Sequence, residues 1–281
     1  MSAPKKKIPR KPRRKRIAFF SGKISKSLYV VLFLLIVFGV GYYYRNALAY
    51  YFSFKTDKTW DNERLHSIRN TQIISSHDGY VAGIDVSEYQ GEIDWTVTDS
   101  VEGKFPIGFV FIRATYGEDC IDARFKSNWP AVKKTPMIRG AYHYYRPDEN
   151  SIKQAQNFIN NVTLTEGDLP PVLDIEKIPE GQSIDSLKTG IRRWLTKVEK
   201  HYKVKPIIYS GEKYYYDFLR DEFKQYTVWI ANYNFFVEEI DEGWQFWQFT
   251  QNGTAKGIEG DVDIDIFNGD GVALRRIRIK K

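Results

Sequence analysis

Beyond Asp78 the chain alternates between short apolar segments and amphipathic segments. Helical patterns lie between the first six apolar segments, whereas the last two follow one another with only short, turn-like connections. Each apolar segment has the length and the β-prone composition of a strand. The predicted strands are Val81–Val86, Phe109–Ala114, Ile138–Tyr145, Pro171–Ile175, Pro206–Tyr209, Val228–Ala231, Gln245–Phe249 and Val262–Ile266.

The clearest helical pattern runs from Ser183 to Tyr202. Ser183 has the side chain of an N-cap, and five apolar residues then repeat at helical spacing on one face: Leu187, Ile191, Trp194, Leu195 and Val198. Strands that alternate with helices imply a largely parallel sheet, and eight of them imply a closed barrel. We therefore predict an α/β fold, a TIM-like β/α barrel over residues 78–281.

The amino-terminal part of the chain has a different pattern. Residues 28–44 (LYVVLFLLIVFGVGYYY) carry no charge and predict one transmembrane helix, a membrane anchor at the short end of the usual length. Residues 1–27 hold eleven Lys/Arg and no acid, which predicts a basic cytoplasmic tail and places the barrel on the other side of the membrane, outside the cytoplasm. The alternative is a secreted protein whose signal peptide is cleaved near Ala49. Residues 45–77 are polar and predict a stalk or linker, with a possible short helix over 62–70.

Charge and cysteine content exclude several classes of function. The net charge of +7 arises in the basic tail, and residues 28–281 have a net charge of −4. We therefore expect no nucleic-acid partner. Cys120 is the only cysteine, and the four histidines show no ligand spacing. We predict no metal and no cofactor.

The segment Pro170 to Glu176, PPVLDIE, carries the candidate chemistry. On a strand, Asp174 and Glu176 point to the same side and lie roughly 6.6 Å apart along the chain. Two like charges so close together raise the proton affinity of one of them, which suits acid–base catalysis on a glycoside. The alternative is an exposed strand end with two solvated acids.

Other predicted strands also end in polar or aromatic residues, among them Asp85, Tyr209, Tyr233 and either Asp263 or Asp265. In a barrel of this type the active site lies at the carboxyl ends of the strands. Acids that arrive at one rim from three different strands are difficult to explain as packing. The sequence therefore predicts one carboxylate-rich site at this rim.

Six motifs in this order resemble glycoside hydrolase family 25, the lysozyme-type muramidases of bacteria, phages and fungi. They are GIDVSEYQGEIDW (83–95), GAYHYY (140–145), PPVLDIE (170–176), PIIYSG (206–211), VWIANY (228–233) and WQFWQFTQNGTAKGIEGDVDIDIFNG (244–269). The resemblance implies a flattened, irregular barrel with five β/α units followed by strands. It also implies peptidoglycan as the substrate, cleaved at the β-1,4 bond between N-acetylmuramic acid and N-acetylglucosamine.

The resemblance assigns roles to four carboxylates. Glu176 matches the general acid, and Asp174 matches a residue that orients the substrate acetamide; direct attack by a carboxylate and inversion through water remain open. Asp85 and Asp263 match groups that bind substrate or tune pKa values. The chain departs from the family at Asp265, where Asn is usual. It also departs at position 116, where relatives often carry an acid and this chain has Tyr.

Four aromatic residues are candidates for stacking on sugar rings, with core packing as the alternative for each: Tyr145, Tyr209, Tyr233 and Trp247. A chitinase-type enzyme would need acids at positions 169 and 172, where this chain has Leu and Val. A catalytically inactive domain that binds the cell wall on the same barrel is the remaining alternative function.

Overall fold

The computed structural model describes residues 26–45, 59–240 and 243–280. The chain divides into two compact units, Met1–Leu48 and Ala49–Lys281. Residues 1–25 of the predicted basic tail and the predicted cleavage site near Ala49 lie outside the described residues.

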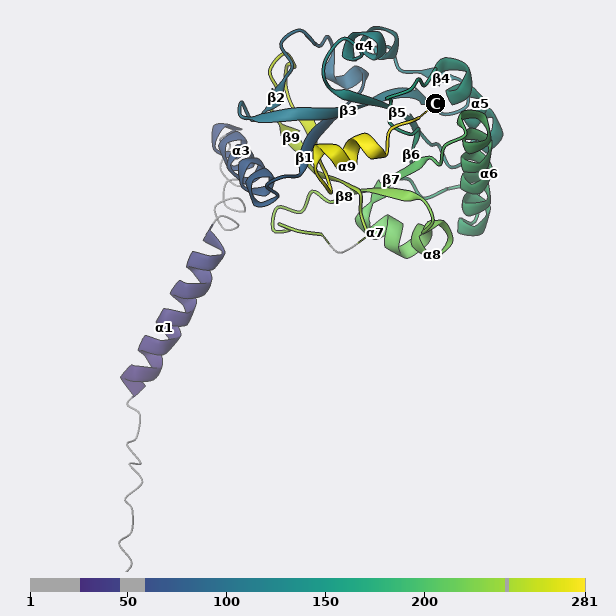
Figure 1. Cartoon of the computed structure of the whole chain (residues 1–281). Coiled ribbons are helices and arrows are strands. Elements are labelled where there is room, and N and C mark those ends of the chain that lie inside the picture. The colour runs from purple at the N-terminus through teal and green to yellow at the C-terminus, as the bar shows by residue number, and fades with distance from the viewer. Residues whose placement is uncertain (1–25, 46–58, 241–242, 281) are drawn as a thin grey trace, which may run out of the picture. The chain divides into compact units, whose positions relative to one another are not determined.

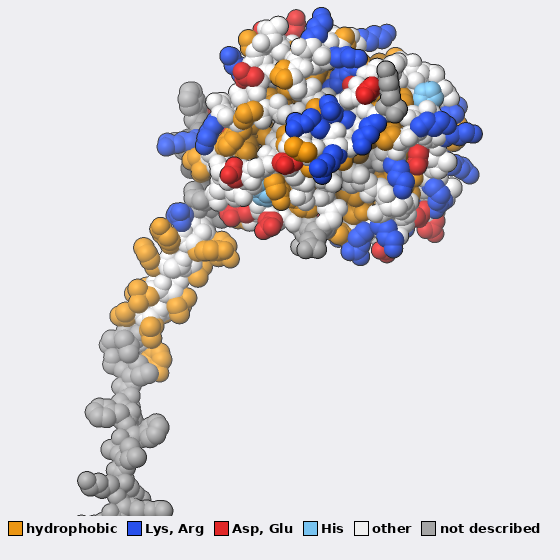
Figure 2. Space-filling view, in the orientation of Figure 1, with side chains coloured by type: hydrophobic (Ala, Val, Ile, Leu, Met, Phe, Trp, Pro, Cys, Tyr) orange, Lys and Arg blue, Asp and Glu red, His pale blue; other side chains and the backbone are white. Residues whose placement is uncertain are grey.

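In the first unit the apolar run forms helix α1 (Lys26–Tyr43). Its large apolar side chains are exposed, and they cover the helix in orange in Figure 2. No helix among residues 26–45, 59–240 and 243–280 is long and apolar enough to cross a membrane, so the predicted transmembrane anchor is not confirmed.

The second unit contains a closed eight-stranded barrel (Figure 1). The strands neighbour one another in the order β1-β10-β9-β8-β7-β6-β5-β3, and β3 pairs with β1 to close the ring. All neighbours are parallel except β10, which is antiparallel to both β9 and β1. The strands are β1 (Val81–Val86), β3 (Phe105–Tyr116), β5 (Ile138–Tyr144), β6 (Val172–Asp174), β7 (Ile207–Gly211), β8 (Thr227–Ala231), β9 (Phe246–Gly253) and β10 (Val262–Phe267). The predicted barrel is thus confirmed.

Helices connect the middle strands on the outside of the barrel (Figure 1). They are α4 (Phe125–Val132), α5 (Ser151–Asn161), α6 (Ile184–Tyr202) and the short consecutive segments α7 (Glu212–Tyr214), η2 (Tyr215–Leu219) and α8 (Arg220–Phe223). Ser183 caps α6 as predicted, because its side chain accepts a hydrogen bond from the Ser186 N–H. The described residues between β8 and β9, and those between β9 and β10, form no helix.

The first connection differs from the prediction. Between β1 and β3 the chain forms only a 3₁₀ turn, η1 (Glu88–Gln90), and a two-residue strand β2 (Ser100–Val101), so the helix expected there is absent. A reciprocal capping box between Ser87 and Gln90 closes the turn, and Gly91, at φ +66°, ends it. A second two-residue strand, β4 (Cys120–Ile121), pairs with the end of β3.

Aromatic side chains fill the amino-terminal end of the barrel. Phe109, Phe111, Phe246 and Phe267 form one buried cluster with Leu274 of the terminal helix α9 (Gly271–Arg276). A Cβ at position 83 would lie 2.3 Å from the Phe109 ring, which explains why β1 carries Gly83 there. The aromatic rings close this end of the barrel, whereas polar side chains lie at the carboxyl end of the strands.

Helix α3 (Thr59–Ser76) corrects the predicted stalk. Ile73 and Ile74 are buried in the core of the barrel unit. The buried Arg69 guanidinium donates hydrogen bonds to four backbone carbonyls, those of Phe235, Asn234, Val237 and Phe249, at 2.9–3.2 Å. Residues 59–76 are therefore part of the barrel unit, and the boundary predicted at residue 78 is wrong. The polarity of the segment concealed this packing, because its buried Arg69 and Asn70 find their partners far along the chain.

Arg69→Met is expected to lower the free energy of unfolding by about 3 kcal/mol, because it leaves buried carbonyls without donors. The midpoint of denaturant unfolding, followed by tryptophan fluorescence, measures the change. Gln72→Ala is the control. Gln72 lies on the same helix as Arg69, but its hydrogen bond to Glu238 is exposed. Equal midpoints for the two variants would contradict the role of Arg69.

Candidate active site

A cleft of about 550 Å³ opens at the carboxyl ends of the barrel strands. Six of the eight predicted site residues line it: Asp85, Asp174, Glu176, Tyr209, Tyr233 and Asp263. They come from β1, β6, β7, β10 and the segments that follow β6 and β8. The barrel therefore brings together acids that are far apart in the sequence.

The predicted pair lies at the end of β6. Asp174 is the last residue of the strand, and the Ile175 N–H still donates to the Tyr209 carbonyl at 3.0 Å, which keeps the backbone extended up to Glu176. Asp174 is 5% exposed, and no described residue hydrogen-bonds to its buried Oδ1. Glu176 is exposed to the cleft. Asp174 thus offers a free acceptor beside a carboxyl that substrate can reach.

The surroundings raise the proton affinity of both acids. Burial and the charge of Glu176 raise the pKa of Asp174 well above its usual range, and Arg113 opposes this shift. Burial by the cleft walls also raises the pKa of Glu176, whereas a hydrogen bond from Tyr209 and the charge of Lys177 oppose the rise. At a given pH the pair therefore holds more protons than two solvated carboxyls, which is what a general acid requires.

A second pair of acids lies across the cleft. Asp85 and Asp263 stand opposite each other in the β1–β10 ladder. The Asp85 carboxylate accepts a hydrogen bond from the Gln248 amide, whose oxygen accepts from the Tyr209 and Tyr233 hydroxyls. Burial and the charge of Asp263 raise the pKa of Asp85, while burial and the charge of Glu176 raise the pKa of Asp263 to about 7. The structure arranges no three His, Cys, Asp or Glu side chains of the described residues to hold a metal ion.

Asp265, one of the two positions at which the chain departs from the resemblance described above, points into the barrel. It is fully buried, and its Oδ1 accepts a hydrogen bond from the Trp229 indole N–H at 2.8 Å. Its Oδ2 has no hydrogen-bond partner among the described residues. Burial and the charge of Asp263 raise the pKa of Asp265 well above its usual range. The extra acid therefore lies beneath the cleft and does not point outward.

Asp265→Asn is expected to stabilise the protein at pH 7 and to change the hydrolysis rate by less than about tenfold, well below the loss of a general acid. The pKa of Asp265 is higher in the folded protein than in the unfolded chain, so its carboxyl lowers the free energy of unfolding at pH values above the unfolded pKa. The gain in melting temperature on removing this carboxyl should therefore vanish as the pH falls below about 4. Melting temperatures of both proteins from pH 3 to 8 test this. A loss of activity equal to that of a Glu176 variant would show that Asp265 takes part in the chemistry.

Several cleft residues were not predicted, and Arg113 is the most informative. It forms ion pairs of 2.8 Å with Glu88 of η1 and with Asp122, which follows β4, and Arg113 and Glu88 both line the cleft. Arg146 and Lys177 are two further cations among the residues that line the cleft, and Arg146 and Arg113 both lie over the Tyr116 ring. The signal for Arg113 was present in the sequence, because it is the single charge in the apolar strand segment FVFIRATY.

The structure corrects two of the predicted sugar contacts. Trp247 is fully buried, and its indole N–H donates to the Asn232 carbonyl, because its neighbour Gln248 takes the inward face of β9. Tyr145 is also buried and points away from the cleft that Tyr144 lines. Side chains alternate along a strand, so one residue of each adjacent pair faces the helices. Core packing is the correct interpretation for Tyr145 and Trp247.

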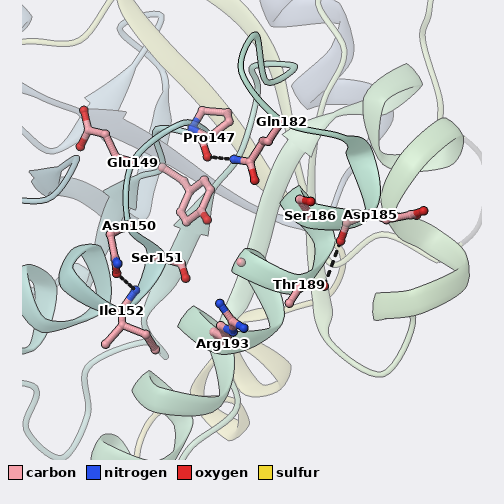
Figure 3. Close-up of a pocket in the computed structure, with 12 residues that line it drawn as sticks. Pro147, Glu149, Asn150, Ser151, Ile152, Gln182, Asp185, Ser186, Thr189 and Arg193 are labelled. Atoms are coloured by element: carbon pink, nitrogen blue, oxygen red, sulfur yellow. Dashed lines mark hydrogen bonds between the residues drawn. The ribbon is translucent and has the colours of Figure 1, made fainter.

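Tyr145 lines a different pocket, of about 460 Å³, at the amino ends of α5 and α6 (Figure 3). Arg193 reaches into this pocket, while the Glu149 carboxylate points away from it and pairs with Arg146. The Gln182 amide donates to the Pro147 carbonyl at its rim. None of the four predicted carboxylates lines this pocket, so it is separate from the candidate active site.

Known proteins resemble the chain over the barrel. The sequence model for the glycosyl hydrolases family 25 matches residues 84–258. The uncharacterized protein YegX of Escherichia coli (strain K12) is 39% identical over 192 residues, which cover 67% of this chain and 70% of that protein. Lysozyme M1 of Streptomyces globisporus is 32% identical over 209 residues, which cover 69% of this chain and 70% of that protein.

Solved structures show the same likeness. A family 25 glycosyl hydrolase from Bacillus anthracis superposes with a TM-score of 0.64 at 30% identity, over 72% of this chain and 95% of that one. A bacterial lysozyme from Streptomyces coelicolor gives a TM-score of 0.63 at 29% identity, over 70% and 96%. The chain therefore belongs to glycosyl hydrolase family 25 and is a glycoside hydrolase of the lysozyme type.

Proposed function

We propose that this protein hydrolyses the β-1,4 bond between N-acetylmuramic acid and N-acetylglucosamine in peptidoglycan. Glu176 is the general acid, and Asp174 orients the substrate acetamide. The observation that supports these roles best is the pair itself. Glu176 reaches the cleft with a raised pKa, and the buried Asp174 beside it keeps one oxygen without a partner among the described residues.

In the proposed reaction Glu176 gives its proton to the glycosidic oxygen as the bond to the anomeric carbon breaks. The acetamide oxygen of the substrate attacks that carbon from the other side. Asp174 Oδ1 accepts the amide N–H and stabilises the positive charge that develops on the acetamide. The charge of Arg113 supports this role, because it favours the ionised form of Asp174. Water then opens the cyclic intermediate and returns a proton to Glu176.

Digestion of purified peptidoglycan by the full-length protein, with mass analysis of the new reducing ends, tests the proposed function. Muramic acid at the new reducing end supports the muramidase, whereas glucosamine there would make the protein a glucosaminidase. Binding of wall material without any new reducing end would instead favour the inactive wall-binding domain. The open cleft, which the four predicted carboxylates line, argues for catalysis.

We also propose attachment to the bacterial cytoplasmic membrane through residues 28–44, with the catalytic unit outside the cytoplasm. The eleven cations that precede the uncharged run and the exposed apolar side chains of α1 support this location. The full-length protein is then expected to remain in the membrane fraction after washing with high salt. A mature soluble form that begins near Tyr50 would show that the segment is a cleaved signal peptide.

A further inference from the structure

A second hollow adjoins the catalytic cleft beyond the end of β1. This hollow, here called the trough, has a volume of about 930 Å³ and lies between the turn after β1 and the loop that joins β9 to β10. Tyr89 and Gln90 line both the trough and the cleft. The two hollows therefore meet at these side chains, and a chain-like ligand in the cleft can continue into the trough.

Tyr89 presents an aromatic surface at this junction. Its side chain is 81% exposed, and the Arg113 guanidinium carbon lies 4.7 Å from the ring centroid. Arg113 is itself held by the ion pairs to Glu88 and Asp122, and the capping box of Ser87 and Gln90 fixes the turn that carries Tyr89. The packing of the described residues leaves most of this ring open to solvent, so it is available for stacking on an apolar sugar face.

The backbone of the trough is well defined. The Asp94 N–H donates to the Gly257 carbonyl at 2.9 Å and joins the two segments that form the trough. Gly257 has φ +83°, and a Cβ there would lie 2.6 Å from the Asp94 carbonyl oxygen. Glycine therefore permits the close approach of the two segments, and the trough exists before any ligand binds.

The charges of the trough indicate what it binds. Glu92, Asp94 and Glu259 line it, and its lining residues include no Lys, Arg or His. Carboxylates accept hydrogen bonds from the hydroxyl and amide groups of uncharged sugars. They repel the carboxylates of a peptide substituent. The cations Arg146 and Lys177, by contrast, lie in the cleft and not in the trough.

We propose that the trough is a saccharide subsite that extends the catalytic cleft and takes sugars of the glycan strand that carry no peptide, with Tyr89 as the stacking surface. This inference rests on the proposed function. It implies that the protein prefers long glycan strands to short ones, because only a long strand occupies both hollows.

The test compares kcat/KM of the full-length protein on long, peptide-free glycan strands with kcat/KM on a tetrasaccharide. Tyr89→Ala is expected to lower the ratio of the two values about tenfold, the scale of one aromatic stacking contact. Tyr89→Phe should keep the ratio, because it keeps the ring. Tyr80→Ala is the matched control, since the exposed Tyr80 precedes β1 at the other end of the strand.

An unchanged ratio in Tyr89→Ala would overturn the inference. Glu259→Lys supplies an independent test of the charge argument, because it should raise the rate on peptide-bearing strands relative to peptide-free ones. An unchanged preference in Glu259→Lys would contradict the proposed selectivity of the trough for sugars without peptide. If the wild-type protein cuts neither the long strands nor the tetrasaccharide, the proposed function is wrong. If it cuts both and the Tyr89 variants have the same ratio as the wild type, only the proposed role of the trough is wrong.

Discussion

Glu176→Gln is expected to abolish hydrolysis of peptidoglycan while the protein still folds and still binds wall material. The amide has nearly the shape of the acid but holds no proton that it can give to a leaving oxygen. General acid catalysis typically contributes 10²–10⁴-fold, so we expect kcat to fall at least about a hundredfold. Release of new reducing ends from purified peptidoglycan measures the rate, and co-sedimentation with the insoluble wall measures binding.

The matched control for this variant is Glu180→Gln. Glu180 is an exposed acid on the same segment after β6, and it is not among the residues that line the cleft. The control should retain the wild-type rate, because it makes the same chemical change outside the site. A Glu176→Gln protein that keeps more than about a tenth of the wild-type rate would remove Glu176 from the role of general acid.

The barrel was predictable because each strand has a local signature. Apolar runs of strand length alternate with amphipathic helices, and this periodicity alone gave eight strands in nearly their observed places. The polar ends of the parallel strands predicted most of the cleft, because parallel strands carry their carboxyl ends to one rim. Asp263 reaches the same rim from the start of the antiparallel strand β10. The missing helix after β1 could not be predicted in the same way, because one capping box and one glycine decide it.

The direction in which a side chain points was harder to predict than the place of its strand in the sequence. The sequence made Trp247 a candidate sugar contact, but it did not show whether Trp247 or its neighbour Gln248 points inward, because adjacent residues of a strand face opposite sides. The docking of α3 depends on Arg69 and on carbonyls more than 160 positions further along the chain, as the pairing with Phe235 shows at a separation of 166. No local pattern reports such a contact. The sequence left open whether Asp263 or Asp265 reaches the rim, and the burial of Asp265 beneath the cleft is visible only in the structure.

Asp174→Asn is expected to lower kcat by about a hundredfold or more on acetylated peptidoglycan. A neutral amide cannot stabilise the positive charge that develops on the substrate acetamide. The loss should not reflect unfolding, because the pKa of Asp174 is raised in the folded protein by burial and by Glu176. A carboxyl whose pKa is raised by folding lowers the free energy of unfolding as the pH rises. The Asp174→Asn variant should therefore melt at or above the wild-type temperature at pH 7.

Deacetylated peptidoglycan separates the role of Asp174 from that of Glu176. If the acetamide is the nucleophile, the wild-type protein cuts deacetylated strands far more slowly, and the product first appears with the β configuration. Asp174→Asn should then cost little on deacetylated strands, because its partner group is already missing, and the two losses are not additive. Equal wild-type rates on both substrates would exclude the attack by the acetamide and leave Glu176 as the general acid. In that case Asp174 acts directly on the anomeric carbon or on water.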